Sequence, residues 1–297
     1  MRAIAAYTGR FAPSPTGPLH LGSLATALGS WLDARMHSGR WLVRIEDIDT
    51  ERCKRQWSEE ILQCLHAHGL RWDDTPWVQS QRGSAYSQAL SSLTEKGLTY
   101  PCACTRKDLD QANLNRAPGQ HRIYPGTCRQ GLPPGRTARA VRFACPQQPV
   151  QWADHRLGLN TDHLPTTSGD FVLMRGDGQW AYHLAVVVDD LQSGVTHIVR
   201  GEDLAETTAR QVAVWQALGG NVAPSYWHLP VILAEDGQKL SKQTGARALD
   251  HGTPIENLNA VWQHFGMKAP QTSTVSDWLT QALGQWPQYR ASQRKVG

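Results

Sequence analysis

The first strong pattern of apolar positions begins behind a stretch rich in Pro and Gly, residues 9–22. Five apolar residues then recur at the i, i+3, i+4, i+7 and i+8 spacing of one helix face. They are Leu24, Ala27, Leu28, Trp31 and Leu32. The pattern predicts a loop followed by a helix that has Ser23 as its N-cap and ends before Gly39.

Short apolar runs predict strands further along the chain. Residues 41–45, apolar except for Arg44, predict a buried strand, and the acidic residues Glu46, Asp47 and Asp49 follow it directly. Residues 183–188 and 197–200 predict two more strands, with Tyr182 at the start of the former. Helices are expected near residues 58–68, ended by Gly69, and over residues 206–218. This alternation of strands and helices predicts an α/β fold.

The middle of the chain has a different pattern, which suggests an inserted subdomain. Residues 102–170 contain paired cysteines, several Pro and Gly residues, and a short strand-like piece at 138–144. We therefore expect the first half of a catalytic domain at residues 1–100 and an insertion at 101–180. The second half is expected at 181–245. A helical region at 246–297 would end in a helix and a frayed tail.

Composition narrows the class of protein. The chain has 297 residues, of which 40% are hydrophobic, and a net charge of +4, which suits a nucleic-acid partner without requiring one. The longest apolar run, residues 184–188, falls far short of the roughly 18 residues of a membrane span. No signal peptide is evident, so we expect a cytoplasmic protein that does not bind membranes. Its six cysteines then favour metal binding or free thiols over disulfides.

Two short motifs carry features suited to phosphate chemistry. The first, His20-Leu21-Gly22-Ser23, lies where the predicted helix begins, and a helix N-terminus offers free N–H groups to a phosphate. The second, Lys239-Leu240-Ser241-Lys242, places two lysines on one loop, where they can neutralise charge in a phosphoryl or adenylyl transfer. Each motif alone is also compatible with an ordinary surface loop.

In this order the motifs resemble the paired HIGH and KMSKS motifs of class I aminoacyl-tRNA synthetases, here HLGS and KLSKQ. Ser23 and Gln243 replace the common histidine and serine. Three further segments resemble the glutamyl and glutaminyl branch: GRFAPSPTG at 9–17, RIEDID at 44–49 and VRGEDL at 199–204. The region around Tyr182 is similar as well. The resemblance implies a Rossmann-like parallel sheet with ligands at the carboxyl ends of its strands.

The resemblance also implies a pocket for glutamate, whose two carboxylates need cationic partners and whose ammonium group needs an acceptor. We assign the ammonium group to Glu46 and the carboxylates to Arg10 and Arg200, without deciding which arginine takes which. The implied glutamate-binding residues are Arg10, Phe11, Ala12, Pro13, Ser14, Glu46, Tyr182 and Arg200.

The implied reaction is attack of the glutamate carboxylate on the α-phosphorus of ATP, accompanied by Mg²⁺, without a covalent enzyme intermediate. His20 and Lys242 are the implied catalytic residues, because they can stabilise negative charge in the transition state. The implied ATP-binding residues are His20, Gly22, Ser23, Lys239, Ser241 and Lys242.

Three cysteines in the expected insertion suggest one structural zinc site. Cys102, Cys104 and Cys128 supply three thiols, and zinc prefers four ligands. His121 is the usual chemical choice for the fourth, whereas the family resemblance points to Tyr124. We favour Tyr124, and free buried thiols remain the alternative.

The short stretch after Lys242 leaves room for a helical region but, we expect, for no anticodon-binding domain. This resembles truncated paralogues of glutamyl-tRNA synthetase. These are expected to be monomers that transfer glutamate to queuosine in the anticodon of tRNA(Asp). Five basic residues are candidates for contacts with RNA: Arg106, Lys107, Arg116, Arg122 and Arg129.

Three alternatives stay open. A minimal glutamyl-tRNA synthetase would charge the 3′ end of tRNA(Glu). A nucleotidyltransferase with a similar first motif would act without tRNA. A non-catalytic RNA-binding paralogue is the third, and the presence of His20, Gly22, Glu46, Lys239 and Lys242 argues against it.

Overall fold

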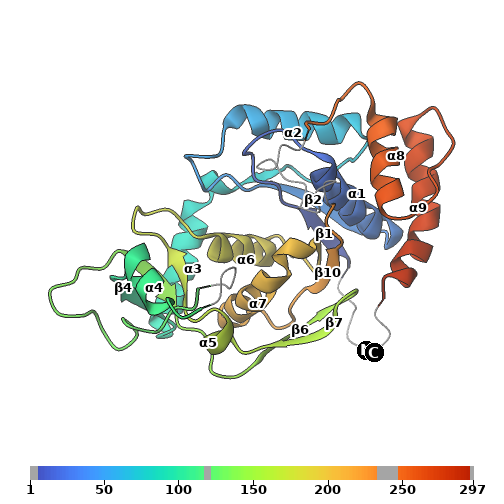
Figure 1. Ribbon diagram of the computed structural model, residues 1–297. Coiled ribbons are helices and arrows are strands. Elements are labelled where there is room, and N and C mark those ends of the chain that lie inside the picture. Colours follow the sequence, from blue (N-terminus) through green and yellow to red (C-terminus); the bar gives the residue numbers. More distant parts are fainter. Residues whose placement is uncertain (1–5, 117–121, 233–246, 295–297) are drawn as a thin grey trace.

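The computed structural model describes residues 6–116, 122–232 and 247–294. Its centre is a set of parallel strands in two adjoining sheets (Figure 1). In one sheet β1 (Thr8–Phe11), β2 (Arg40–Ile45) and β3 (Trp77–Val78) are parallel. In the other, β10 (Ser225–Leu229) runs parallel to β9 (His197–Gly201) and to β6 (Val150–Asp154). The predicted parallel sheet is thus confirmed.

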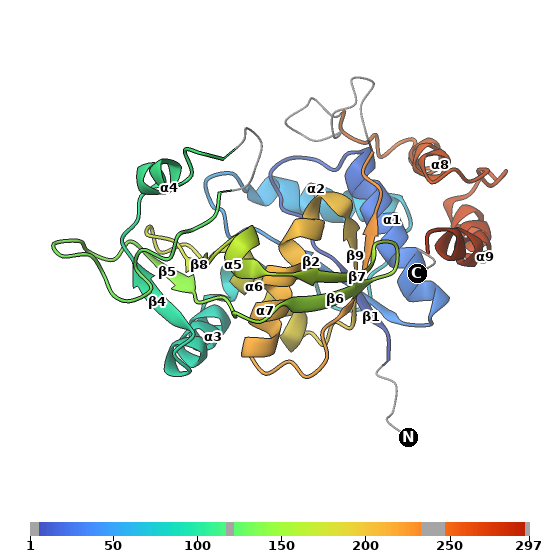
Figure 2. The same cartoon turned by 60° about the horizontal axis from the view of Figure 1, so that its bottom comes forward.

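The two sheets meet along β1 and β9. The backbone N–H of Thr196, just before β9, donates to the carbonyl of Thr8 in β1 at 2.9 Å. β6 also pairs antiparallel with β7 (Gly158–Asp162), so a hairpin from the expected insertion joins the β9–β10 sheet. Figure 2 shows this hairpin in front of the central strands. Residues at or just after the carboxyl ends of β1, β9 and β10 line one cavity, so these ends open on the same side of the molecule.

Helices connect and cover the strands. The larger ones are α1 (Leu21–Met36), α2 (Arg55–Ala67), α3 (Gly83–Glu95), α6 (Tyr182–Gln192), α7 (Thr208–Ala217), α8 (Pro254–His264) and α9 (Val275–Ser292). The shorter ones are η1 (Gln79–Gln81), α4 (Arg106–Ala112), α5 (Leu164–Thr167) and η2 (Glu202–Thr207). No helix in the described ranges is both long and apolar enough to span a membrane.

A small antiparallel sheet lies at one end of the molecule. It contains β4 (Thr99–Cys102), β5 (Ala140–Phe143) and β8 (Phe171–Met174), with β5 in the middle. Figure 1 shows β4 and α4 at the opposite end from α8 and α9. The cysteine cluster described below thus lies far from the C-terminal helices.

The C-terminal helices α8 and α9 pack on α1. Four fully buried tryptophans, Trp41, Trp262, Trp278 and Trp286, belong to the core that they share with β2. The helical character of this segment was predicted, but its buried face was not. Apolar residues there are separated by many polar ones, so the segment seemed polar as a whole.

Several predicted elements are confirmed, and two predictions were wrong. The strands at 41–45 and 197–200 and the helices near 58–68 and 206–218 are present as β2, β9, α2 and η2–α7. The predicted strand at 183–188 is instead part of α6, which Tyr182 begins. Its apolar run lacks a period because α6 is buried from Leu184 to Asp190, and a short unbroken apolar run does not distinguish helix from strand.

The second wrong prediction concerns the N-cap of α1. The cap is His20 rather than Ser23, because the helix already begins at Leu21. The Nδ1 atom of His20 accepts from the backbone N–H of Ser23 at 3.4 Å. Ser23 therefore lies inside the first helical turn.

Candidate active site

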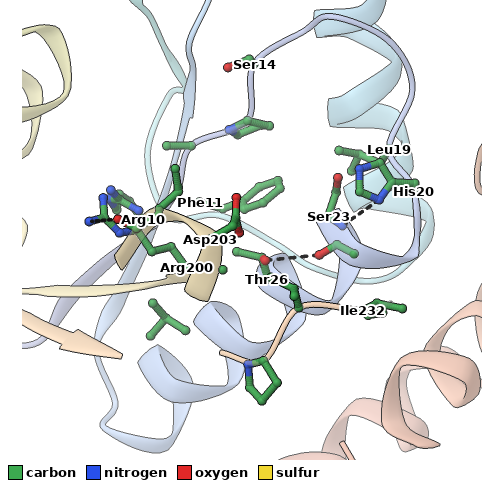
Figure 3. Close-up of a pocket in the computed structure, with 18 of the residues that line it drawn as sticks. Arg10, Phe11, Ser14, Leu19, His20, Ser23, Thr26, Arg200, Asp203 and Ile232 are labelled. Atoms are coloured by element: carbon green, nitrogen blue, oxygen red, sulfur yellow. Dashed lines mark hydrogen bonds between the residues drawn. The ribbon is translucent and has the colours of Figure 1, made fainter. Parts of the chain in front are cut away.

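A cavity of about 400 Å³ lies where β1, β9 and β10 end and α1 begins. Predicted residues supply much of its lining: Arg10, Phe11, Ala12, Pro13, Ser14, His20, Gly22, Ser23 and Arg200. Figure 3 shows Arg10 and Arg200 on one side of this cavity and His20 with Ser23 on the other. The fold therefore brings the first phosphate motif and both predicted arginines to one space.

The side of the cavity formed by α1 suits an anion. His20 caps the helix in an extended conformation, and the first backbone N–H groups of α1 have no partner within the helix. No acidic side chain lies in the first turn. The partial positive charge of the helix start is thus left for a ligand.

Arg10 lies in a buried network of ion pairs. Its guanidinium contacts both oxygens of Asp190 at 3.3 and 3.4 Å. Arg44 binds the same carboxylate at 2.6 Å and reaches Glu46 at 3.0 Å. Burial alone would raise the pKa of Asp190, but Arg10 and Arg44 outweigh it and hold this pKa below its usual value. Asp190 is therefore a charged anchor for two arginines.

Arg200 has a different environment. It is 2% exposed, and within the described residues its hydrogen bonds go to neutral acceptors on His228, Gln211, Leu204, Thr207 and Thr208. Among the described residues no carboxylate forms an ion pair with this guanidinium. A buried guanidinium without a counter-ion on the wall of a cavity is suited to binding a ligand carboxylate.

Glu46 and Tyr182 line a second cavity of about 320 Å³, which shares Ser14 and Thr16 with the first. Burial raises the pKa of Glu46, although Arg44 and Arg10 oppose this. Burial likewise raises the pKa of Tyr182. Glu46, the predicted acceptor for an ammonium group, therefore does not line the same cavity as Arg10 and Arg200. Residues 14–16 connect its cavity to theirs.

The sequence did not point to several residues that organise the site. Asp190 of α6 contacts Arg10, and His228 of β10 contacts Arg200. Asp154 of β6 in turn holds the His228 ring. Asp203 also lines the first cavity. Only Asp203 had a signal, because it lies in the VRGEDL segment; the other three lie in unremarkable local sequence.

The predicted cysteines converge beside β4. The sulfur atoms of Cys102, Cys104 and Cys128 all lie within 4.8 Å of one another. The Tyr124 hydroxyl lies 3.5 Å from the Cys102 sulfur and 3.8 Å from the Cys104 sulfur. This cluster is buried except at Cys104.

These distances match those of a tetrahedral zinc site. Zn–S bonds of about 2.3 Å at tetrahedral angles place two sulfurs about 3.8 Å apart, and the Cys104 and Cys128 sulfurs are 3.7 Å apart. The buried Arg142 donates to the Cys102 sulfur at 3.2 Å and stacks on the Tyr124 ring at 3.8 Å. The positive charge of Arg142 would offset the negative charge of a site rich in thiolates.

Some predicted residues lie outside the described ranges. These are Lys239, Ser241, Lys242 and Gln243 of the second motif, and His121, the alternative zinc ligand. Among the candidates for RNA contact, Arg122 pairs with Asp110 at 2.8 Å and Arg129 with Asp170 at 3.3 Å. Arg106, Lys107 and Arg116 are exposed.

Comparison with known proteins gives a consistent result. Residues 7–269 match the model of the family described as tRNA synthetases class I (E and Q), catalytic domain. Among curated relatives, a glutamyl-Q tRNA(Asp) synthetase from Cupriavidus metallidurans is 51% identical, covering 94% of this chain and 91% of the relative. One of the same name from Leptothrix cholodnii is 50% identical, covering 94% and 96%.

A solved structure is similar as well. The glutamate-tRNA synthetase from Elizabethkingia anophelis superposes with a TM-score of 0.70 at 30% identity, covering 81% of this chain. The match covers 53% of that synthetase, so the chain spans about half of its length.

Proposed function

We propose a function for this chain, which belongs to the family of class I tRNA synthetases for glutamate and glutamine and is a ligase of that type. It activates L-glutamate with ATP to glutamyl-AMP, with release of pyrophosphate. It then transfers the glutamyl group to the queuosine base of tRNA(Asp), with release of AMP. The relatives named glutamyl-Q tRNA(Asp) synthetase, about half identical over nearly the whole chain, support this acceptor.

The observation that carries glutamate as the substrate is the pair of buried arginines on one cavity. Arg10 and Arg200 can each donate to a carboxylate, and Glu46 next to the shared 14–16 loop can accept from an ammonium group. Where Arg200, which has no counter-ion among the described residues, receives the side-chain carboxylate, a neutral amide in its place would leave the charge of Arg200 unpaired. Glutamine is therefore rejected.

ATP would lie across the start of α1. The N–H groups of Leu21 and Gly22 in the first turn, and the Nε2 atom of His20, can hold phosphate oxygens, and Gly22 lets the phosphates approach the backbone. Lys239, Ser241 and Lys242 are proposed to complete this site. Mg²⁺ bound with ATP supplies neutralisation of the phosphate charge. The protein then accelerates the reaction by positioning and by electrostatic stabilisation.

Transfer of labelled glutamate, with ATP and Mg²⁺, to purified tRNAs tests the proposal. The acceptors are tRNA(Asp) with queuosine, the same tRNA without it, and tRNA(Glu). Label only on the queuosine-containing tRNA(Asp) is expected. Label on tRNA(Glu) would instead identify an enzyme that charges the 3′ end, and no label on any tRNA despite adenylate formation would indicate a nucleotidyltransferase.

We also propose that Cys102, Cys104, Cys128 and Tyr124 hold one structural zinc ion, on the distances given above. Metal analysis of the purified protein is expected to give one zinc per chain. Cys128→Ser should lose it, whereas Cys53→Ser, at a partly exposed thiol outside the cluster, should keep it. Tyr124→Phe separates the two candidate fourth ligands. Unchanged zinc affinity in this variant would exclude the phenolic oxygen.

A further inference from the structure

Arg200 is held by a set of acceptors that use most of its donor groups. Nε donates to Nε2 of His228 at 3.0 Å, and Nη1 donates to Oε1 of Gln211 at 2.7 Å. Nη2 donates to Oγ1 of Thr208 at 2.9 Å, with longer bonds to Leu204 and Thr207. A guanidinium has five N–H groups. One Nη1 hydrogen therefore has no acceptor among the described residues.

His228 can accept from Arg200 only if its Nε2 atom carries no proton. A carboxylate at the other end of the ring fixes this state. Oδ2 of Asp154 lies 2.7 Å from His228 Nδ1 and also accepts from the His228 backbone N–H at 3.0 Å. Nδ1 must thus be the protonated ring nitrogen, which leaves the Nε2 lone pair facing Arg200.

Asp154 is itself held as a carboxylate. Its second oxygen, Oδ1, accepts from the backbone N–H groups of Arg156 and Leu157 at 2.9 and 2.8 Å. Four donors therefore converge on two oxygens. Burial would raise the pKa of Asp154, but these hydrogen bonds and that of His228 outweigh it and keep the pKa below its usual value.

The ring of His228 remains neutral in this arrangement. Its side chain is fully buried, and burial together with the nearby Arg200 charge lowers its pKa, although Asp154 opposes this. The negative charge of Asp154 is thus one ring away from Arg200 rather than in contact with it. The orientation of the Arg200 guanidinium is therefore fixed, although Asp154 does not contact it.

We propose that Asp154 and His228 are positioning residues for recognition of the substrate carboxylate. They hold Arg200 through a neutral acceptor, so that its charge and its free Nη1 hydrogen stay available to a carboxylate in the cavity. The proposal rests on the proposed function, because glutamate is the ligand whose carboxylate Arg200 reads. It adds a role for the β6–β7 hairpin, which supplies Asp154.

Two substitutions of His228 separate positioning from simple structural support. In His228→Asn the side-chain amide can still donate to Asp154, but no acceptor reaches Nε of Arg200. In His228→Gln the longer side chain places an amide oxygen near the former Nε2 atom. Asp162→Asn is the matched control, because Asp162 lies on the same hairpin but accepts from Trp152 at 2.7 Å instead.

Pyrophosphate exchange then measures the KM of each substrate. His228→Asn is expected to raise the KM for glutamate about 10- to 100-fold through misplacement of Arg200, with the KM for ATP unchanged. His228→Gln should recover most of this loss, and Asp162→Asn should resemble the unmodified protein. Equal effects of His228→Asn on both substrates, or no effect on either, would overturn the proposal.

A second measurement does not depend on activity. Nitrogen-15 NMR of the ring of His228 in the unmodified protein should show the neutral form protonated at Nδ1. A ring protonated at Nε2, or at both nitrogens, would overturn the positioning role. If the unmodified protein activates no glutamate, the proposed function fails, and the ring protonation state still decides the positioning role of Asp154 and His228.

Discussion

Arg10 and Arg200 lie on adjacent strands and line the same cavity, yet their surroundings differ in charge. Arg10 in β1 shares the carboxylate of Asp190 with Arg44, so its charge is balanced within the protein. Among the described residues Arg200 in β9 donates to neutral acceptors, and the carboxylate of Asp154 acts on it through His228. Both guanidinium groups are nearly fully buried.

The difference separates two uses of a buried cation. An arginine in a closed ion-pair network stabilises the fold, and removing its partner leaves a charge that burial makes costly. An arginine that is hydrogen-bonded to neutral acceptors contributes less to stability, and its positive charge stays available to a ligand. The Arg10 side should therefore respond to mutation mainly in stability, and the Arg200 side mainly in substrate affinity.

The largest expected effect is that of Asp190→Asn. Arg10 and Arg44 would both lose their shared carboxylate, and the free energy of unfolding should fall by about 3–5 kcal/mol. Urea unfolding measures this loss, with Asp162→Asn as the control. A loss as small as that of the control would show that the Arg10 network is not the stabilising side.

Arg200→Met should show the opposite behaviour. We expect kcat/KM for glutamate to fall by about 10²- to 10³-fold, because a buried partner of the substrate carboxylate is lost. The free energy of unfolding should change less than in Asp190→Asn, since no carboxylate is left unpaired. Exchange kinetics and urea unfolding of the same preparation make the comparison. A larger loss of stability than in Asp190→Asn would break the contrast.

The pH dependence of stability gives a smaller effect. Because the native pKa of His228 lies below its ordinary value of 6.5, the unfolded state takes up the proton first, and stability falls as the pH drops below that value. From about pH 7.5 to about pH 5.5 this contribution reaches at most about 1.4 kcal/mol. His228→Gln should lack it. Parallel urea unfolding curves at both pH values, with the same fall in both proteins, would contradict the assignment.

The smallest effect is expected at an exposed ion pair. Arg55 and Glu59 are 3.0 Å apart on α2, with side chains 92% and 60% exposed. Glu59→Gln should not change the free energy of unfolding measurably, because water and salt screen the pair. A clear loss would mean that this exposed pair does stabilise the protein and cannot serve as the reference for the buried networks.

The sequence was informative where the signal is local. The strand at residues 41–45 stands out as an apolar run bounded by polar residues, and the three cysteines of the cluster lie within one segment. The helix start near residue 20 was also predicted, although the observed N-cap, His20, lies three residues before the predicted one, Ser23. Such features depend on neighbours in the chain.

Features that depend on distant residues could not be predicted. Asp154, Arg200 and His228 are brought together by the pairing of β6, β10 and β9, which no short pattern reveals. The prediction of a strand where α6 lies was wrong for a related reason. Burial on nearly all sides removes the alternation of polar and apolar positions that distinguishes a helix from a strand.

The packing of α9 on α1 has a consequence for the order in which the protein can fold during synthesis. Asp33 of α1 accepts from Tyr7 near the start of the chain at 2.7 Å and from Arg290 near its end at 2.8 Å. During translation the first strands and α1 leave the ribosome long before α9. Until α9 has been synthesised, the core that α1 shares with Trp278 and Trp286 lacks these side chains, so the packing around α1 is completed late.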